Sequence, residues 1–363
     1  MFYGIKGYSV DPCGCIFARF RLKAQVAPVV AAPLAGVAVF AWVLLQAPVI
    51  LRDIDQSFHT FHPHERHWNT YISIRTRKFN LSNNTGTTYN AVDQFVWFDL
   101  VSIRIFGRAG CNMGMISVDY QDTVAMVRLN RDTKNALSLD LVGELDEILM
   151  GTRHDPRVHG LVLGSKSDKF FSIGFDIRQM FEFPREDFEV FFQAFNRVCL
   201  SLYTFPKPTV AAITGHAVAG GCILVLCCDY RFIGDDRRLM GLNEIKLGVP
   251  VPYLAVCVLR DIVGARVAKG IIDDGEFHGP MESLQMGLVD KVFPTGEVNE
   301  HAVRKAKCTG SWPLGAFALI KQNRTEEVEK RFLISGEKKA KAFIDCWYSD
   351  ESRQLLKDAL HKF

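Results

Sequence analysis

The sequence predicts an α/β fold with a largely parallel sheet and a helical C-terminal portion for residues 115–363. Short apolar runs of strand type alternate there with stretches in which apolar residues recur every three or four positions. From about Pro252 onward the pattern becomes mostly helical. Alternation of strands and helices implies βαβ units, whose strands lie parallel in one sheet.

The elements can be assigned in chain order. A hairpin is expected first, from Ile116 through a turn at Gln121 and Asp122 to the strand Val124–Leu129. Ser138 can cap the next helix, which places Leu139, Val142, Leu145 and Leu149 on one face and closes at Gly151. The later expected elements are a buried strand Val158–Leu163, a helix Asp187–Tyr203, a strand Thr209–Ile213 and a charged amphipathic helix Glu351–Leu360.

Length and charge set limits on the class of protein. The chain has 363 residues, 48% of them hydrophobic and 23% charged, which is enough for a large buried core. Residues 1–114 carry 11 Lys/Arg against 6 Asp/Glu, whereas residues 115–363 carry 32 against 34. Nucleic-acid binding needs a concentrated basic surface, so the near-neutral C-terminal part excludes that class. The ten cysteines are scattered without zinc-site spacing, which indicates reduced thiols.

The N-terminal third contains a candidate membrane segment. Residues 24–51 include no ionisable side chain and are long enough to cross a bilayer as a helix. Three prolines interrupt this run and leave only Leu34–Ala47, 14 residues, which also suits a signal-type segment or a buried helix. Residues 52–114 show no sustained period and have the pattern of unstructured polypeptide. The histidines in this stretch have no ligand partners at metal-site spacing (His59, His62, His64 and His67).

Three interpretations of residues 1–114 follow. The segment is a membrane anchor, or it is a targeting segment, or translation begins near Met113 or Met115, where the regular pattern starts. The cellular location is therefore unknown from the sequence. A start near Met115 implies a cytoplasmic protein, whereas a genuine N-terminal segment implies a membrane-anchored or organellar one.

Two glycine-containing turns are the most informative places for function. Residues 170–176 (FFSIGFD) and 215–222 (GHAVAGGC) each lie where a strand passes into a helix. The first N–H groups of a helix have no intrahelical acceptor, and the helix dipole adds partial positive charge there. Two such turns from neighbouring units can direct two N–H donors at one anionic oxygen, as stabilisation of an enolate requires.

Four segments resemble the enoyl-CoA hydratase/isomerase, or crotonase, family over about residues 115–363. They are NRDTKNALS (130–138), KFFSIGFDIRQM (169–180), residues 206–232 and GLNEIKLGVPVP (241–252). The resemblance implies a crotonase-type ββα spiral, an acyl-CoA substrate, and assembly as a homotrimer or a dimer of trimers. It implies no metal and no separate cofactor, because CoA is part of the substrate.

The resemblance also assigns roles to positions of this chain. The two oxyanion donors correspond to the backbone N–H groups of Ile173 and Gly220, and the branched Ile173 side chain should narrow the acyl pocket. Asp176 is equally well explained as the N-cap of the following helix. The residues expected to cradle CoA are Lys134, Asn135, Ala136, Ser172, Gly174 and Asp176.

The acid/base positions discriminate between reactions of the family. Its hydratases use two glutamates, and here the first position is Ile223 while the second is Glu244. A lone carboxylate suits double-bond migration better than hydration, so the sequence resembles the Δ3,Δ2-enoyl-CoA isomerases. The apolar neighbours expected to raise the pKa of Glu244 are Leu242, Ile245, Leu247 and Val249. The alternatives are a hydratase or other enolate-forming enzyme of the family, and a non-catalytic acyl-CoA-binding protein.

Overall fold

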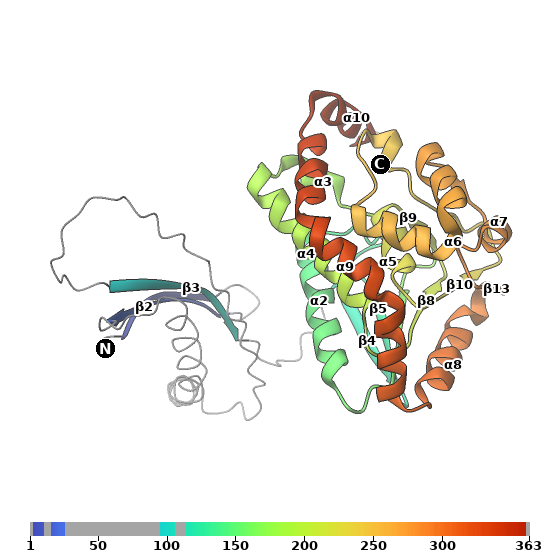
Figure 1. The fold of residues 1–363 in the computed structure, drawn as a ribbon, viewed down its shortest axis with the longest axis horizontal. Coiled ribbons are helices and arrows are strands. Elements are labelled where there is room, and N and C mark those ends of the chain that lie inside the picture. Colours follow the sequence, from blue (N-terminus) through green and yellow to red (C-terminus); the bar gives the residue numbers. More distant parts are fainter. Residues whose placement is uncertain (1–2, 11–15, 26–94, 106–113, 361–363) are drawn as a thin grey trace. The chain divides into compact units, whose positions relative to one another are not determined.

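The computed structural model describes residues 3–10, 16–25, 95–105 and 114–360, which belong to two separate units, Met1–Asn112 and Met113–Phe363 (Figure 1). In the first unit, β2 (Ile16–Gln25) pairs antiparallel with both β1 (Tyr3–Val10) and β3 (Phe95–Ile105). The prediction of unstructured polypeptide over 52–114 was therefore wrong for β3. Its aromatic and β-branched residues favour a strand, and residues 101–105 alternate apolar with polar side chains.

The candidate membrane segment lies outside the described residues, except for Ala24 and Gln25 at the end of β2. The histidines at 59–67 lie outside them entirely. Within the parts of the chain that the structure describes, no helix combines the length and the apolar character needed to cross a membrane.

The larger sheet of the second unit has six strands in the order β13-β10-β8-β6-β5-β4. Strand β4 (Ile116–Gln121) pairs antiparallel with β5 (Val124–Leu129), as the predicted hairpin requires. The remaining neighbours are parallel: β5, β6 (Gly160–Ser165), β8 (Thr209–Ile213), β10 (Tyr230–Gly234) and β13 (Lys291–Phe293). The predicted parallel sheet is confirmed.

A second, four-stranded sheet makes the fold a spiral. Its order is β12 (Phe277–His278), β11 (Met240–Gly241), β9 (His216–Val218) and β7 (Phe170–Ser172). Each turn of the chain adds one strand to each sheet and then a helix: β6, β7 and α3 (Ile177–Glu182) with α4 (Arg185–Tyr203), then β8, β9 and α5 (Gly220–Leu226). This repetition is the ββα spiral expected from the sequence.

Different helices pack on the two faces of the larger sheet. Along β5, Val127 and Leu129 lie in the main core with α2 (Leu139–His154) and α4, whereas Val124 and Met126 pack with α8 (Val298–Gly310). Successive strand side chains point to opposite faces, so both faces must be apolar. The inner strands β6 and β8 are accordingly apolar runs, whereas the edge strand β4 alternates apolar and polar residues.

Element boundaries moved by a few residues from those predicted. Ser138 caps α2 as expected, since its hydroxyl accepts from the N–H of Leu141 at 3.2 Å. The helix nevertheless continues past Gly151 to His154, because glycine inside a helix lowers its stability by only about 1 kcal/mol relative to alanine. Strand β6 begins at Gly160 rather than Val158, whose N–H closes a turn onto Asp155.

The C-terminal portion is helical, as predicted. It contains η1 (Glu244–Leu247), α6 (Tyr253–Asp274), α7 (Pro280–Met286), α8, α9 (Leu314–Trp347) and α10 (Asp350–Leu360). The long helix α9 packs on α4 and α6, and Figure 1 shows it running alongside α4.

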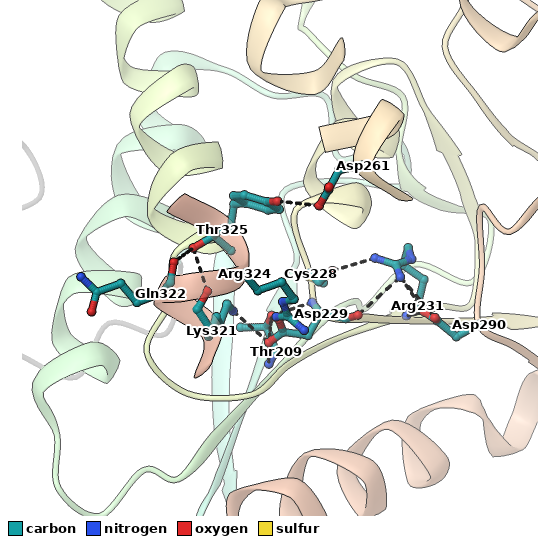
Figure 2. A network of polar contacts seen from close by, with 11 residues as sticks. Thr209, Cys228, Asp229, Arg231, Asp261, Asp290, Lys321, Gln322, Arg324 and Thr325 are labelled. Atoms are coloured by element: carbon teal, nitrogen blue, oxygen red, sulfur yellow. Dashed lines mark hydrogen bonds and ion pairs between the residues drawn. The ribbon is translucent and has the colours of Figure 1, made fainter. Parts of the chain in front are cut away.

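A buried ion pair fastens α9 to the larger sheet (Figure 2). Lys321 Nζ lies 2.8 Å from Asp229 Oδ2, and the two side chains are 2% and 3% exposed. Arg324 pairs with the other carboxylate oxygen, and Thr209 at the start of β8 donates to Asp229 from its backbone N–H and its hydroxyl. Burial lowers the pKa of Lys321, while Asp229 opposes that change.

Candidate active site

The two glycine-containing turns lie in backbone contact. Strands β7 and β9 pair in parallel, which brings the turns after them side by side. Gly174 has φ +89°, and a Cβ atom there would lie 2.9 Å from the nitrogen of Gly220. A Cβ atom on Gly221 would lie 2.4 Å from the carbonyl oxygen of Ser172. Only glycine permits this approach, so the glycines of both turns have a steric explanation.

The two predicted oxyanion donors differ in their present partners. The N–H of Ile173 donates to the carbonyl oxygen of Lys134 at 3.1 Å. A thioester oxygen would therefore have to share or replace that acceptor. Gly220 is the first residue of α5, where an N–H has no acceptor within the helix. Its donor is available to a ligand.

A cavity of about 470 Å³ opens beside these turns. It is lined by six of the nine residues predicted for the site, namely Lys134, Ala136, Ile173, Asp176, Gly220 and Glu244. These residues come from four turns that are far apart in the sequence. The spiral brings them together because each turn follows a strand of one of the two sheets.

Asn135, Ser172 and Gly174, which were also expected to contact CoA, do not line the cavity. Asn135 is fully buried, and its amide donates to Ser165 Oγ at 2.9 Å. The Ser172 hydroxyl donates to the carbonyl of Asn135 at 2.8 Å and accepts from the N–H of Gly174 at 3.1 Å. These three residues stabilise the turns by hydrogen bonds made away from the cavity wall.

Asp176 has two structural partners as well as a place on the wall. One carboxylate oxygen accepts from the N–H of Gln179 at 3.2 Å, so the N-cap interpretation is confirmed. The other pairs with the guanidinium of Arg131 at 2.6 Å. Asp132, a further carboxylate on the wall, accepts from the N–H groups of Lys134 and Asn135.

Glu244 differs from these paired carboxylates. It begins η1, is 5% exposed, and its Oε2 has no hydrogen-bond partner among the described residues. Burial raises the pKa of Glu244 to about 8, although a hydrogen bond from its own backbone N–H lowers it. The group is therefore poised to exchange a proton near neutral pH.

The apolar surroundings of Glu244 are largely those predicted. Leu242 is fully buried, and Leu247 and Val249 line the cavity. Ile245 was a wrong prediction, because its side chain is 53% exposed to solvent.

The position that would carry a second glutamate lies in the core. Ile223 is 1% exposed within α5. The adjacent Cys222 is also buried. Its burial is the main cause that raises the pKa of its thiol, and the charge of Glu244 raises it further. The titratable side chain of α5 that senses the charge of Glu244 is thus a thiol rather than a carboxylate.

The sequence interpretation missed several residues of the wall. Phe343 and Trp347 at the end of α9, and Ala359 and Leu360 at the end of α10, close the cavity. No spacing signal links these helices to turns more than one hundred residues earlier. His216, in the second turn, also lines the cavity. Its Nδ1 accepts from the N–H of Leu239 at 3.0 Å, which leaves Nε2 as the donor of the neutral ring.

The ββα spiral and the paired turns beside the cavity define the crotonase class of α/β fold. The chain belongs to the enoyl-CoA hydratase/isomerase family, whose model matches residues 119–362.

Individual relatives include both activities of that family. The chain is 28% identical to human mitochondrial enoyl-CoA delta isomerase 1 over 256 residues, which cover 70% of this chain and 85% of that protein. It is 29% identical to a short-chain-enoyl-CoA hydratase of Clostridium acetobutylicum, over 68% of this chain and 95% of that protein.

Solved structures agree with the fold assignment. The crystal structure of human mitochondrial Δ3-Δ2-enoyl-CoA isomerase matches 69% of this chain and 98% of its own with a TM-score of 0.67, at 28% identity. An enoyl-CoA hydratase from Bacillus halodurans matches with a TM-score of 0.63 over 68% of this chain and 100% of its own, at 22% identity, which shows the fold alone.

Proposed function

We propose that this chain is an enoyl-CoA isomerase that moves the double bond of a 3-enoyl-CoA to position 2, with Glu244 as its single base. The observation that carries the proposal is the carboxylate pattern of the cavity. Glu244 is buried with an unpartnered oxygen, Asp132 and Asp176 are already bonded, and Ile223 occupies the position of a second glutamate.

The reaction needs only groups present at this site. The Glu244 carboxylate takes a proton from C2, and the negative charge moves to the thioester oxygen. The N–H groups of Ile173 and Gly220 stabilise that oxygen, and loss of one such donor costs roughly 3–4 kcal/mol of transition-state stabilisation. The protonated Glu244 then returns its proton at C4, which completes the migration.

The remaining parts of the proposal concern the substrate and its setting. CoA enters as part of the substrate, so no metal or separate cofactor has a step in this reaction. The family resemblance supports a homotrimer or a dimer of trimers. The mitochondrial relatives favour an organellar location over a cytoplasmic one for this chain.

The test compares two reactions of the purified full chain, isomerisation of a 3-enoyl-CoA and hydration of the matched 2-enoyl-CoA. Glu244→Gln keeps the shape of the side chain and removes its basicity, and it should lower isomerisation about 10²- to 10⁴-fold. Glu300→Gln is the control, since Glu300 lies on the surface of α8 and pairs with Arg304.

Three outcomes would contradict the proposal. Full isomerase activity of Glu244→Gln would contradict the single-base mechanism. Hydration faster than isomerisation would assign a hydratase instead. Tight acyl-CoA binding without turnover of either substrate would assign a binding protein.

A further inference from the structure

The turn that carries Glu244 ends at a residue held by the C-terminal helix. Gly248 follows η1 in the left-handed conformation, with φ +72°. Its carbonyl oxygen accepts from the Ser352 hydroxyl at 2.6 Å and from the Cys346 thiol at 3.2 Å. Ser352 is 1% exposed, so water does not compete for this bond.

The hydrogen bonds within the turn connect Gly248 to the backbone of Glu244. The N–H of Gly248 donates to the carbonyl of Ile245, and the N–H of Val249 donates to the carbonyl of Glu244 itself, both at 3.1 Å. These bonds close one short loop of backbone. A displacement of the Gly248 carbonyl therefore moves Glu244 with it.

Ser352 lies in the first turn of α10, directly after the corner between α9 and α10, and both helices contribute residues to the cavity wall. Phe343 and Trp347 reach the wall from α9, and Ala359 and Leu360 reach it from α10. The corner is fixed on its other side by Tyr348, whose hydroxyl donates to the carbonyl of Phe183 at 2.8 Å. The surface that closes the acyl pocket and the support of the base are thus one piece of structure.

We infer that Ser352 is a positioning residue for Glu244, holding the turn at 244–249 so that the carboxylate stays aimed into the closed pocket. The inference rests on the proposed function, because it concerns the base of that reaction. A reacting group that shifts by about 1 Å can lose about 10²-fold in rate, so one hydrogen bond at the support can matter.

The environment of Glu244 provides a readout that general destabilisation would not change. Its pKa is raised by burial, and the titratable group facing it from α5 is the buried Cys222 thiol. Lys246 on its own turn is exposed and pairs with Glu276 at the surface. Loosening the turn would admit water to the carboxylate, so its pKa would fall toward the ordinary value.

The experiment measures kcat, KM and the pH dependence of kcat/KM for isomerisation by the full chain. Ser352→Ala should lower kcat about tenfold or more and move the acid limb of the pH profile, expected near pH 8, to lower pH. Ser352→Thr keeps the donor and should recover most of the rate. Ser311→Ala is the matched control, because Ser311 donates to the carbonyl of Cys308 at an exposed helix end.

The outcomes separate this inference from the proposed function. Wild-type turnover that depends on Glu244, together with an unchanged kcat and acid limb in Ser352→Ala, would overturn the positioning role alone. A loss of kcat with an unmoved acid limb would also overturn it, as would an equal loss in Ser352→Thr. A wild-type chain without Glu244-dependent isomerisation would overturn both.

Discussion

Glu244 combines two properties that oppose each other at the scale of a single residue. A carboxylate among Leu242, Leu247 and Val249 is costly to ionise, yet the same desolvation makes it a stronger base once ionised. A folded protein that keeps such a group loses stability at neutral pH. Sites of this kind are where function, rather than stability, explains the choice of residue.

Replacement of Glu244 should therefore stabilise the protein in a pH-dependent way. The pKa of Glu244 is about 8 in the folded chain and near 4.5 without its environment, so the folded state binds the proton more tightly. Its contribution to stability is full below pH 4.5 and is lost as pH rises to 8. Glu244→Gln should gain up to about 5 kcal/mol over wild type at pH 9 and almost nothing at pH 4.5.

Urea unfolding at pH 4.5, 7 and 9 measures this difference, with Glu300→Gln as the surface control. A gain that is the same at all three pH values would mean that the carboxylate is not desolvated in the folded chain.

Some residue roles were predictable from the sequence and others were not. The caps Ser138 and Asp176 were, because a short polar side chain before an apolar helix satisfies N–H groups that lie next to it in the chain. Ser172 and Asn135 look like ligand contacts in the motif, but the Ser172 hydroxyl donates to the Asn135 carbonyl and the Asn135 amide donates to Ser165 Oγ. Such long-range bonds depend on how the spiral closes, which no local pattern specifies.

The paired turns show how two elements constrain each other. The first turn could be shifted only if the second moved too, since Gly174 and Gly221 approach the opposite backbone closely. The sequence indicated two glycine-rich turns at strand ends, and topology decided that they meet. The strands and helices themselves followed from periodicity, and their ends shifted where a glycine or a turn bond altered the boundary.

Gly221→Ala should damage the site through this contact. A Cβ atom there would lie 2.4 Å from the Ser172 carbonyl, which is backbone and cannot rotate away. We expect a loss of about 1–3 kcal/mol in unfolding free energy, with a lower kcat because the Gly220 donor moves. Gly151→Ala in α2 is the control, since nothing lies within 4 Å and the helix should gain about 0.5–1 kcal/mol.

Thermal unfolding and isomerase assays of both glycine variants provide the comparison. Equal stability of Gly221→Ala and wild type would show that the two turns are not in rigid contact.

At the scale of the whole second unit, helices α9 and α10 complete the wall of the cavity. Helix α9 contacts the larger sheet through Lys321 and ends at Phe343 and Trp347 in the cavity wall. The sequence predicted that this segment is helical but not where the helix packs. An amphipathic pattern shows which face of a helix is buried, but it does not show which element that face packs against. The buried contact of Lys321 with Asp229 is what fixes that path at the N-terminal half of the helix (Figure 2).

Lys321→Met tests this anchor. It leaves the Asp229 carboxylate buried with weaker compensation, and removal of one partner of a buried pair costs about 3–5 kcal/mol. Arg324→Met is the matched comparison on the same helix and the same carboxylate. Arg324 is 50% exposed, so its loss should cost less than about 1 kcal/mol. Denaturant unfolding of both variants measures the difference.

The double variant Lys321→Met with Asp229→Asn should recover part of the loss, because the uncompensated charge is then gone. Equal destabilisation by the Lys321 and Arg324 variants would mean that water reaches the Asp229 carboxylate and that α9 is held by apolar packing instead.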